Sequence, residues 1–160
     1  MSASKIKKIK KSILISIIFG LLGIFVEISF TAFSTVFTDK GINWSLEGKT
    51  YVWMFFIYAL IKPLFDIGYP KVSKLNVLIR IFIYSIIILL IEFISGFLLE
   101  TLIGICPWKY NRGLTFLGYI RLDYIFFWML FGYIIEYVYL FLENVITFDS
   151  YKLHKTTNGK

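Results

Sequence analysis

The sequence predicts an all-α integral membrane protein with four transmembrane helices, and three observations lead to this prediction. The chain of 160 residues is 58% hydrophobic, with a mean hydropathy of +0.76, which lies outside the range of soluble globular domains. Four apolar runs approach or exceed the ~20 helical residues that a bilayer core requires. Basic residues gather at the ends of these runs, as in proteins oriented in a membrane.

The predicted membrane domain extends over residues 12–146 and contains four runs: 12–37, 51–68, 77–105 and 124–146. The first run is too long for the apolar core of a cleaved signal peptide, so it is predicted to remain as an anchor. Pro63 interrupts the second run, which is predicted to be a span kinked there or a helix that ends nearby.

Three further segments are polar or mixed. The basic arm, residues 1–11, precedes the first run. Residues 106–121 are amphipathic and punctuated by glycine, which predicts an interfacial or re-entrant segment. The polar tail, residues 147–160, is predicted to be disordered.

The distribution of basic residues predicts that both termini are cytoplasmic. Four spans place the arm, the connection between the second and third runs, and the tail on one side, with eleven Lys and Arg residues. The other side carries five: Lys40, Lys49, Lys109, Arg112 and Arg121. Because cytoplasmic loops carry the excess of basic residues, we expect a multi-pass protein of the cell membrane with its termini inside.

Charged residues within the apolar runs are the candidate functional residues: Glu27, Glu92, Glu136 and Lys62. A charge at bilayer depth costs at least ~2.5 kcal/mol, so such groups usually face the protein interior. Small and polar residues share the face of the first run that carries Glu27, and similar stripes run along the other helices. We therefore expect the three glutamates to meet in the bundle interior, with Lys62 as counter-charge and at least one carboxyl protonated at neutral pH.

The chain also reads as a duplication. Glu27 is followed by Trp44 and Gly48, and Glu92 is followed at similar distances by Trp108 and Gly113. Each half would contain an acidic helix, a Trp/Gly loop on the outer side and a second helix. This predicts two parallel two-helix repeats related by an axis along the membrane normal.

Several classes of function find little support. Cys106 is the only cysteine and His154 the only histidine, so an intrachain disulfide and a Cys/His metal cluster are excluded. The positive charge lies at the ends of membrane spans, which argues against nucleic-acid binding. No motif for a Ser-His-Asp, Cys-His or phosphate-loop enzyme is present, so a role without catalysis is favoured over an enzyme, and no cofactor is expected.

Two stretches resemble a known family. Residues 44–58 contain Trp44, Gly48, Trp53 and Tyr58, and residues 92–114 contain the second pattern: Glu92, Pro107, Trp108, Asn111, Arg112 and Gly113. With the region from Gly23 to Glu27, they resemble the CmpB-like ABC-transporter permeases and their uncharacterised multi-pass relatives in eukaryotes. The resemblance covers about residues 20–145 and implies a transport permease in which these positions are family-typical.

The sequence thus predicts a small permease-like transport component with an intramembrane carboxylate centre that binds a proton, a cation or a substrate. Four spans are few for a transport path, so we expect a homodimer or a membrane partner subunit, and an ATPase subunit is a further candidate partner. Two alternatives stay open. One is a lipid-headgroup enzyme or lipid-binding protein using Lys109, Arg112 and Glu100. The other is a non-catalytic assembly subunit.

Overall fold

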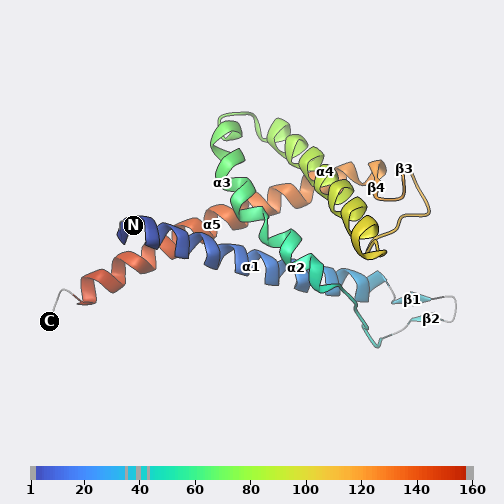
Figure 1. Cartoon of the computed structure of the whole chain (residues 1–160), viewed down its shortest axis with the longest axis horizontal. Coiled ribbons are helices and arrows are strands. Elements are labelled where there is room, and N and C mark those ends of the chain that lie inside the picture. The colour runs from blue at the N-terminus through green and yellow to red at the C-terminus, as the bar shows by residue number, and fades with distance from the viewer. Residues whose placement is uncertain (1–2, 35, 39–40, 43, 158–160) are drawn as a thin grey trace. The chain divides into compact units, whose positions relative to one another are not determined.

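The computed structural model describes residues 3–34, 36–38, 41–42 and 44–157 (Figure 1). Within these residues, four helical segments of 31, 21, 27 and 25 residues are long and apolar enough to span a membrane. The prediction of a mainly helical membrane protein with several spans is therefore confirmed. Lys40 and Lys160, two of the charges that predict orientation, lie outside the described residues.

The chain divides into two compact units, Met1–Asp66 and Ile67–Lys160. The first unit contains, in order, α1 (Ala3–Ser34), β1 (Phe37–Thr38), β2 (Gly41–Ile42), α2 (Val52–Ala59) and the start of α3 (Ile61–Val72). The second contains the end of α3, α4 (Val77–Ile103), β3 (Thr115–Phe116), β4 (Ile120–Arg121), the 3-10 helix η1 (Leu122–Tyr124) and α5 (Ile125–Thr157).

Glycine positions on α1 bring α2 into close contact with it. A Cβ atom at Gly20 would lie 2.6 Å from the ring of Phe55, and one at Gly23 would overlap the ring of Tyr58. Small residues in membrane helices allow backbones to approach in this way. The small-residue face predicted for the first run is thus the face that α2 covers.

The second helical segment is interrupted at Leu60, three residues before Pro63, which agrees with the predicted helix end near that proline. Leu60 separates α2 from α3, and α3 then continues through Pro63 and Pro70 to Val72. Proline lacks an N–H and its ring collides with the carbonyl four residues earlier, here that of Ala59. The disturbance therefore falls in the turn before Pro63, and the helix continues beyond it.

The second unit is built on the contact between α4 and α5. Asn76 caps the start of α4, since its side chain accepts a hydrogen bond from the Leu78 N–H at 2.9 Å. A Cβ atom at Gly132 of α5 would lie 2.8 Å from the Cβ of Tyr84, so a glycine is needed for this approach. Tyr84 and Tyr139 are both buried at the contact.

Two short hairpins add strands to the predicted all-α class. Strands β1 and β2 pair antiparallel, as do β3 and β4, which join Thr115 to Arg121 and Phe116 to Ile120. Leu117 and Gly118 turn the second hairpin with φ of 51° and 75°. Because Gly118 adopts a positive φ without a steric penalty, residues 115–121 form a hairpin in place of a re-entrant helix.

The polar stretch 147–157, predicted to be disordered, is helical in the structure. It continues α5 without a break as far as Thr157. Extending an existing helix needs no new nucleation, so a polar segment can remain helical after an apolar one.

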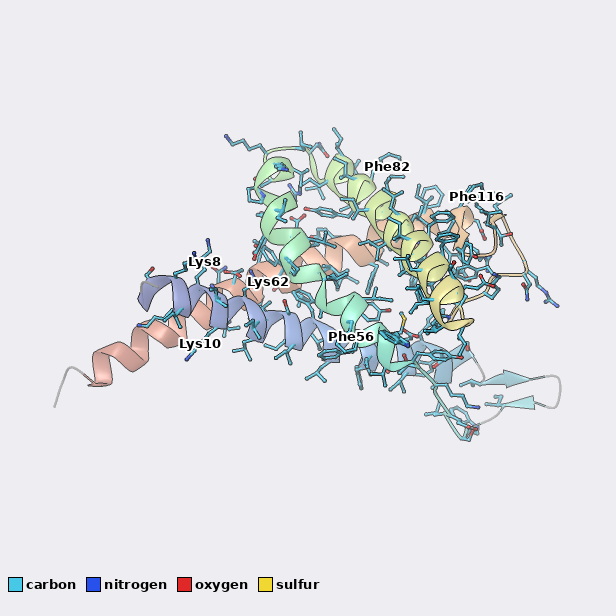
Figure 2. All side chains as sticks on the ribbon, viewed as in Figure 1. Lys8, Lys10, Phe56, Lys62, Phe82 and Phe116 are labelled. Atoms are coloured by element: carbon cyan, nitrogen blue, oxygen red, sulfur yellow. The ribbon has the colours of Figure 1, made fainter. Side chains whose placement is uncertain are left out.

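Large apolar side chains cover the outside of the helices in both units. Phe56 and Phe82, labelled in Figure 2, are 55% and 48% exposed, and Leu102 is 76% exposed. A soluble protein would hide surfaces of this kind, whereas lipid acyl chains solvate them.

The contact at Gly23 yields a stability prediction. Replacing Gly23 by Ala forces Tyr58 away from α1, so we expect a loss of about 1–3 kcal/mol of unfolding free energy. Gly68→Ala is the matched control because nothing lies within 4 Å of a Cβ there. Thermal unfolding in detergent, followed by circular dichroism, compares the two; equal midpoints would contradict the proposed close contact.

Candidate functional site

Glu27 is held in the first unit by a tyrosine of α2. The Tyr58 hydroxyl donates a hydrogen bond to Glu27 Oε2 at 3.3 Å. Thr50 also lies near this carboxylate, and its hydroxyl oxygen is buried without a hydrogen-bond partner among the described residues. The predicted site residues Glu27 and Tyr58 are thus brought together.

The loop before α2 is attached to α1 close to this carboxylate. The Thr31 hydroxyl accepts from the Lys49 N–H at 2.9 Å and contacts the Lys49 carbonyl at 3.0 Å. A Cβ atom at Gly48 would overlap the carbonyl of Ile28, so only glycine allows the loop to lie this close. These contacts place Thr50 beside Glu27 and explain why Gly48 belongs to the site.

Glu92 occupies a comparable setting in the second unit. The Tyr110 hydroxyl donates to Glu92 Oε1 at 3.0 Å. Glu92 Oε2 is buried with no hydrogen-bond partner among the described residues, and so is Trp128 Nε1. The Trp128 side chain lies next to the Glu92 carboxylate. The site therefore contains a buried acceptor oxygen close to a buried N–H donor.

The loop after α4 carries Tyr110 to this position. The Tyr110 N–H donates to the carbonyl of Gly118 at 2.8 Å, and Trp108 Nε1 donates to the carbonyl of Tyr119 at 3.1 Å. A Cβ atom at Gly96 of α4 would lie 3.2 Å from the Tyr119 ring, so the loop packs directly on that helix. The predicted residue Trp108 therefore supports the loop.

Carboxylates already engage two of the basic residues in this loop. Lys109 donates to Glu100 Oε1 at 2.6 Å and lies 4.5 Å from the centroid of the Tyr119 ring. Arg121 is paired with Asp123. The phosphate pocket that the lipid-headgroup alternative requires would have to break the pair between Lys109 and Glu100.

Three loop groups have shifted pKa values. Burial and the neighbouring Glu92 raise the pKa of the Tyr110 hydroxyl, so Tyr110 remains a hydrogen-bond donor at any physiological pH. The bond to Glu100 raises the pKa of Lys109. Burial raises the pKa of the Cys106 thiol, which reduces its thiolate fraction near neutral pH.

The remaining loop residues of the prediction are spread over the surface. Gly113 has a φ of 85°, and a Cβ atom there would lie 2.8 Å from Arg121 Nε, so glycine is required. Pro107 is partly buried. The other four are exposed: Trp44, Trp53, Asn111 and Arg112.

Glu136 is bound to Arg80 and not to a hydroxyl. Arg80 Nε donates to Glu136 Oε2 at 3.0 Å, and Nη2 donates to Oε1 at 2.7 Å. The two side chains are only 13% and 7% exposed. Arg80 Nη1 also donates to the carbonyl of Leu75 at 3.1 Å, so this ion pair joins the α3–α4 turn to α5.

The counter-charge predicted from the sequence is therefore corrected. Lys62 is buried, but it pairs with Asp66 one helical turn later on α3. Glu136 takes its counter-charge from Arg80, which the sequence indicates only as an orientation charge near the membrane surface. Arg80 lies in the first turn of α4, and its long side chain reaches the facing helix.

The structure does not bring Glu92 and Glu136 into one centre. Glu92 lies near Trp128, whereas Glu136 binds Arg80, and Arg80 is twelve residues before Glu92 on α4. That separation corresponds to about 18 Å along the helix axis. Glu27 belongs to the first unit, where its described neighbours are Tyr58 and Thr50.

Sequence reasoning missed Arg80, Thr50 and the contact of Trp128 with Glu92. Helical spacing places Trp128 on the inward face with Gly132 and Glu136, but it does not indicate that Trp128 meets Glu92. Thr50 carries no comparable signal, because its position depends on where a loop folds back.

No protein-family model matches the chain, and no solved structure matches it with statistical significance. Within the part of the chain that the structure describes, no cluster of three or more His, Cys, Asp and Glu side chains could hold a metal ion. The arrangement can bind protons or small polar groups at two carboxylates, each held by a neutral hydroxyl.

The ion pair at Glu136 yields a second prediction. Glu136→Gln leaves a buried guanidinium without its counter-charge, so we expect a loss of about 3–5 kcal/mol of unfolding free energy. Arg80→Met with Glu136→Met should lose less than the sum of the single changes. The exposed pair of Glu47 and Lys49 is the control and should contribute about 0–1 kcal/mol. Unfolding in detergent measures all variants, and strict additivity at Arg80 and Glu136 would contradict the pairing.

Cys106 yields a third prediction, which concerns pH. Because only the thiolate reacts with a maleimide, a raised pKa should slow labelling of the folded protein at pH 7–8 and shift the rise in rate to higher pH. Mass spectrometry measures the rate, with the chain unfolded in sodium dodecyl sulfate as reference. Equal rates in both states at pH 7.5 would show that Cys106 is not shielded.

Proposed function

We propose that this protein is a permease-like component of a membrane transport system, in which Glu27 and Glu92 bind a proton or a small cation. One observation carries the proposal. Within the described residues, both membrane-depth carboxylates are held by a tyrosine hydroxyl and neither forms an ion pair, whereas Glu136 has an arginine. A carboxylate without a fixed cation can accept a transported one.

The polar surroundings of the two carboxylates support this role. Glu92 Oε2 and Trp128 Nε1 are buried without a hydrogen-bond partner among the described residues. The hydroxyl oxygen of Thr50, beside Glu27, is likewise buried without a hydrogen-bond partner in that part of the chain. Buried polar atoms are normally paired, and unpaired ones often mark a site that a ligand or water completes. Glu92 Oε2 and the Thr50 hydroxyl oxygen are the acceptors that a proton or cation arriving at these carboxylates would contact.

The order of elements supports an internal duplication of the site. The first unit runs from α1 through a hairpin to α2 and α3, and the second runs from α4 through a hairpin to α5. In each unit a glutamate of the first helix accepts a hydrogen bond from a tyrosine that follows in the sequence. Two parallel repeats with one carboxylate each are therefore part of the proposal.

The wider setting also belongs to the proposal. The protein would lie in the cell membrane with both termini in the cytoplasm, as the distribution of Lys and Arg indicates. It would act as a homodimer or with a membrane partner, since a four-helix chain is small for a complete path. The resemblance to CmpB-like permeases adds an ATPase subunit as a candidate partner.

Substitution of the carboxylates tests the proposed function. The chain, with any subunits that co-purify in mild detergent, is reconstituted in liposomes with a pH-sensitive dye inside and an imposed proton gradient. We expect Glu27→Gln and Glu92→Gln each to reduce proton flux at least about tenfold, because an amide cannot carry the proton. Tyr58→Phe should have a smaller effect.

Glu47→Gln is the matched control, since this glutamate is exposed in the loop before α2. It should leave the flux unchanged. Normal flux in Glu27→Gln and Glu92→Gln, together with reduced abundance in membranes, would contradict transport and favour an assembly role for the carboxylates.

A further inference from the structure

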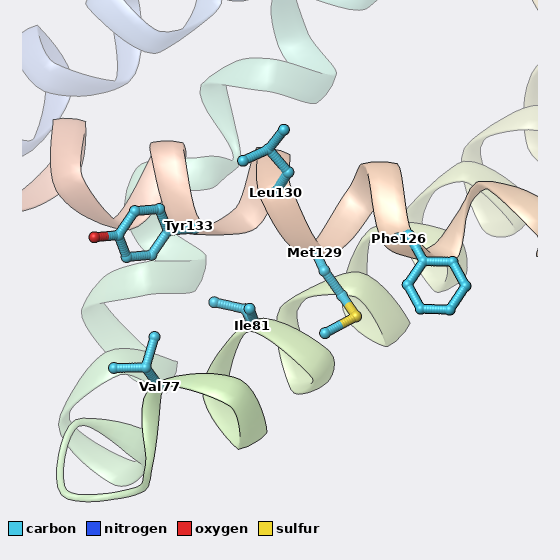
Figure 3. Close-up of a pocket in the computed structure, with 6 residues that line it drawn as sticks. All are labelled: Val77, Ile81, Phe126, Met129, Leu130 and Tyr133. Atoms are coloured by element: carbon cyan, nitrogen blue, oxygen red, sulfur yellow. The ribbon is translucent and has the colours of Figure 1, made fainter.

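An apolar groove lies between α4 and α5 of the second unit (Figure 3). Its volume is about 400 Å³, and six side chains line it: Val77, Ile81, Phe126, Met129, Leu130 and Tyr133. Tyr133 and Val77 lie at one end and Phe126 at the other. Both helices are apolar enough to span a membrane, so the groove would open into the bilayer.

The shape and lining of the groove fit an acyl chain better than a second helix. From Phe126 to Tyr133 the groove follows seven residues of α5, about 10 Å along the helix axis. Helices that pack closely in membranes meet at small residues, and this lining contains none. Met129 and Leu130 are flexible apolar side chains of the kind that adapt to a thin, irregular occupant.

Basic residues lie next to the Val77 end of the groove. Lys74 is three residues before Val77, in the α3–α4 turn, and Lys71 is in the last turn of α3. Both are exposed, and neither forms an ion pair within the described residues. Arg80, the third cation in this region, is already bound to Glu136. Two uncompensated positive charges beside an apolar groove complement an anionic headgroup on an acyl chain.

We infer that this groove is a binding site for an anionic phospholipid. One acyl chain lies along α4 and α5 between Val77 and Phe126, and the phosphate lies near Lys71 and Lys74. The inference is independent of the carboxylate sites, because it uses neither Glu27 nor Glu92. It also differs from the headgroup site predicted at the outer loop, since it lies at the opposite end of α4.

Native mass spectrometry of the full chain in detergent tests this site. Phosphatidylglycerol and phosphatidylcholine with identical acyl chains are titrated separately onto delipidated protein. Each lysine near an anionic lipid contributes about fivefold in affinity, so we expect phosphatidylglycerol to bind at least about tenfold more tightly. The double variant Lys71→Gln with Lys74→Gln should bind both lipids equally, whereas Lys49→Gln, in the loop before α2 of the first unit, should keep the preference.

A second variant tests the groove itself. Leu130→Trp fills part of the groove. It should lower the affinity for both lipids on the order of tenfold, because the acyl chain loses buried contacts. Leu90→Trp, on an exposed part of α4 outside the groove, is the control. Ile81→Phe repeats the test if Leu130→Trp does not elute as a single species.

Three results would overturn the inference. Equal binding of the two lipids by the unmodified chain would exclude the headgroup site. Equal effects of Leu130→Trp and Leu90→Trp would indicate only non-specific lipid at the surface. A change from dimer to monomer in Leu130→Trp, without a change in lipid binding, would assign the groove to a second copy of the chain.

Discussion

Polar groups at bilayer depth must find partners inside the protein, and this requirement decides which helix faces meet. Glu27, Glu92 and Glu136 are each held by a side chain from another segment of their own unit. Water is absent from the bilayer core, so an unsatisfied carboxylate there costs more than most packing contacts supply. The glycines that face Tyr58 and Tyr84 then allow the helices to come close enough for these bonds to form.

The kind of partner distinguishes Glu136 from the other two carboxylates. Glu136 meets a guanidinium with two parallel hydrogen bonds, which is the geometry that Arg and carboxylate favour. Its charge is compensated, and its partner Arg80 also binds the α3–α4 turn. Glu27 and Glu92 meet hydroxyl groups, which orient a carboxylate without neutralising it. Both therefore keep the capacity to bind a proton or a cation, and the proposal of transport rests on this difference.

The loops take part in the sites as much as the helices do. Thr31 binds the backbone of Lys49, and Tyr110 reaches Glu92 from a loop that packs on α4. In the second unit the loop supplies the donor to Glu92, whereas in the first unit the loop fixes Thr50 beside Glu27 and helix α2 supplies the donor. The lipid groove, in contrast, depends only on the contact between α4 and α5 and on the turn that precedes α4.

The sequence by itself determined the membrane class, the approximate spans and the small-residue face of α1, because length, hydropathy and helical spacing are local properties. It also identified the three glutamates as buried or half-buried groups at membrane depth. Only the tertiary structure decided their partners, since Arg80 meets Glu136 across fifty-six positions of the chain. The reach of a long side chain and the path of a loop depend on which faces meet in space, and no periodicity in the sequence encodes that.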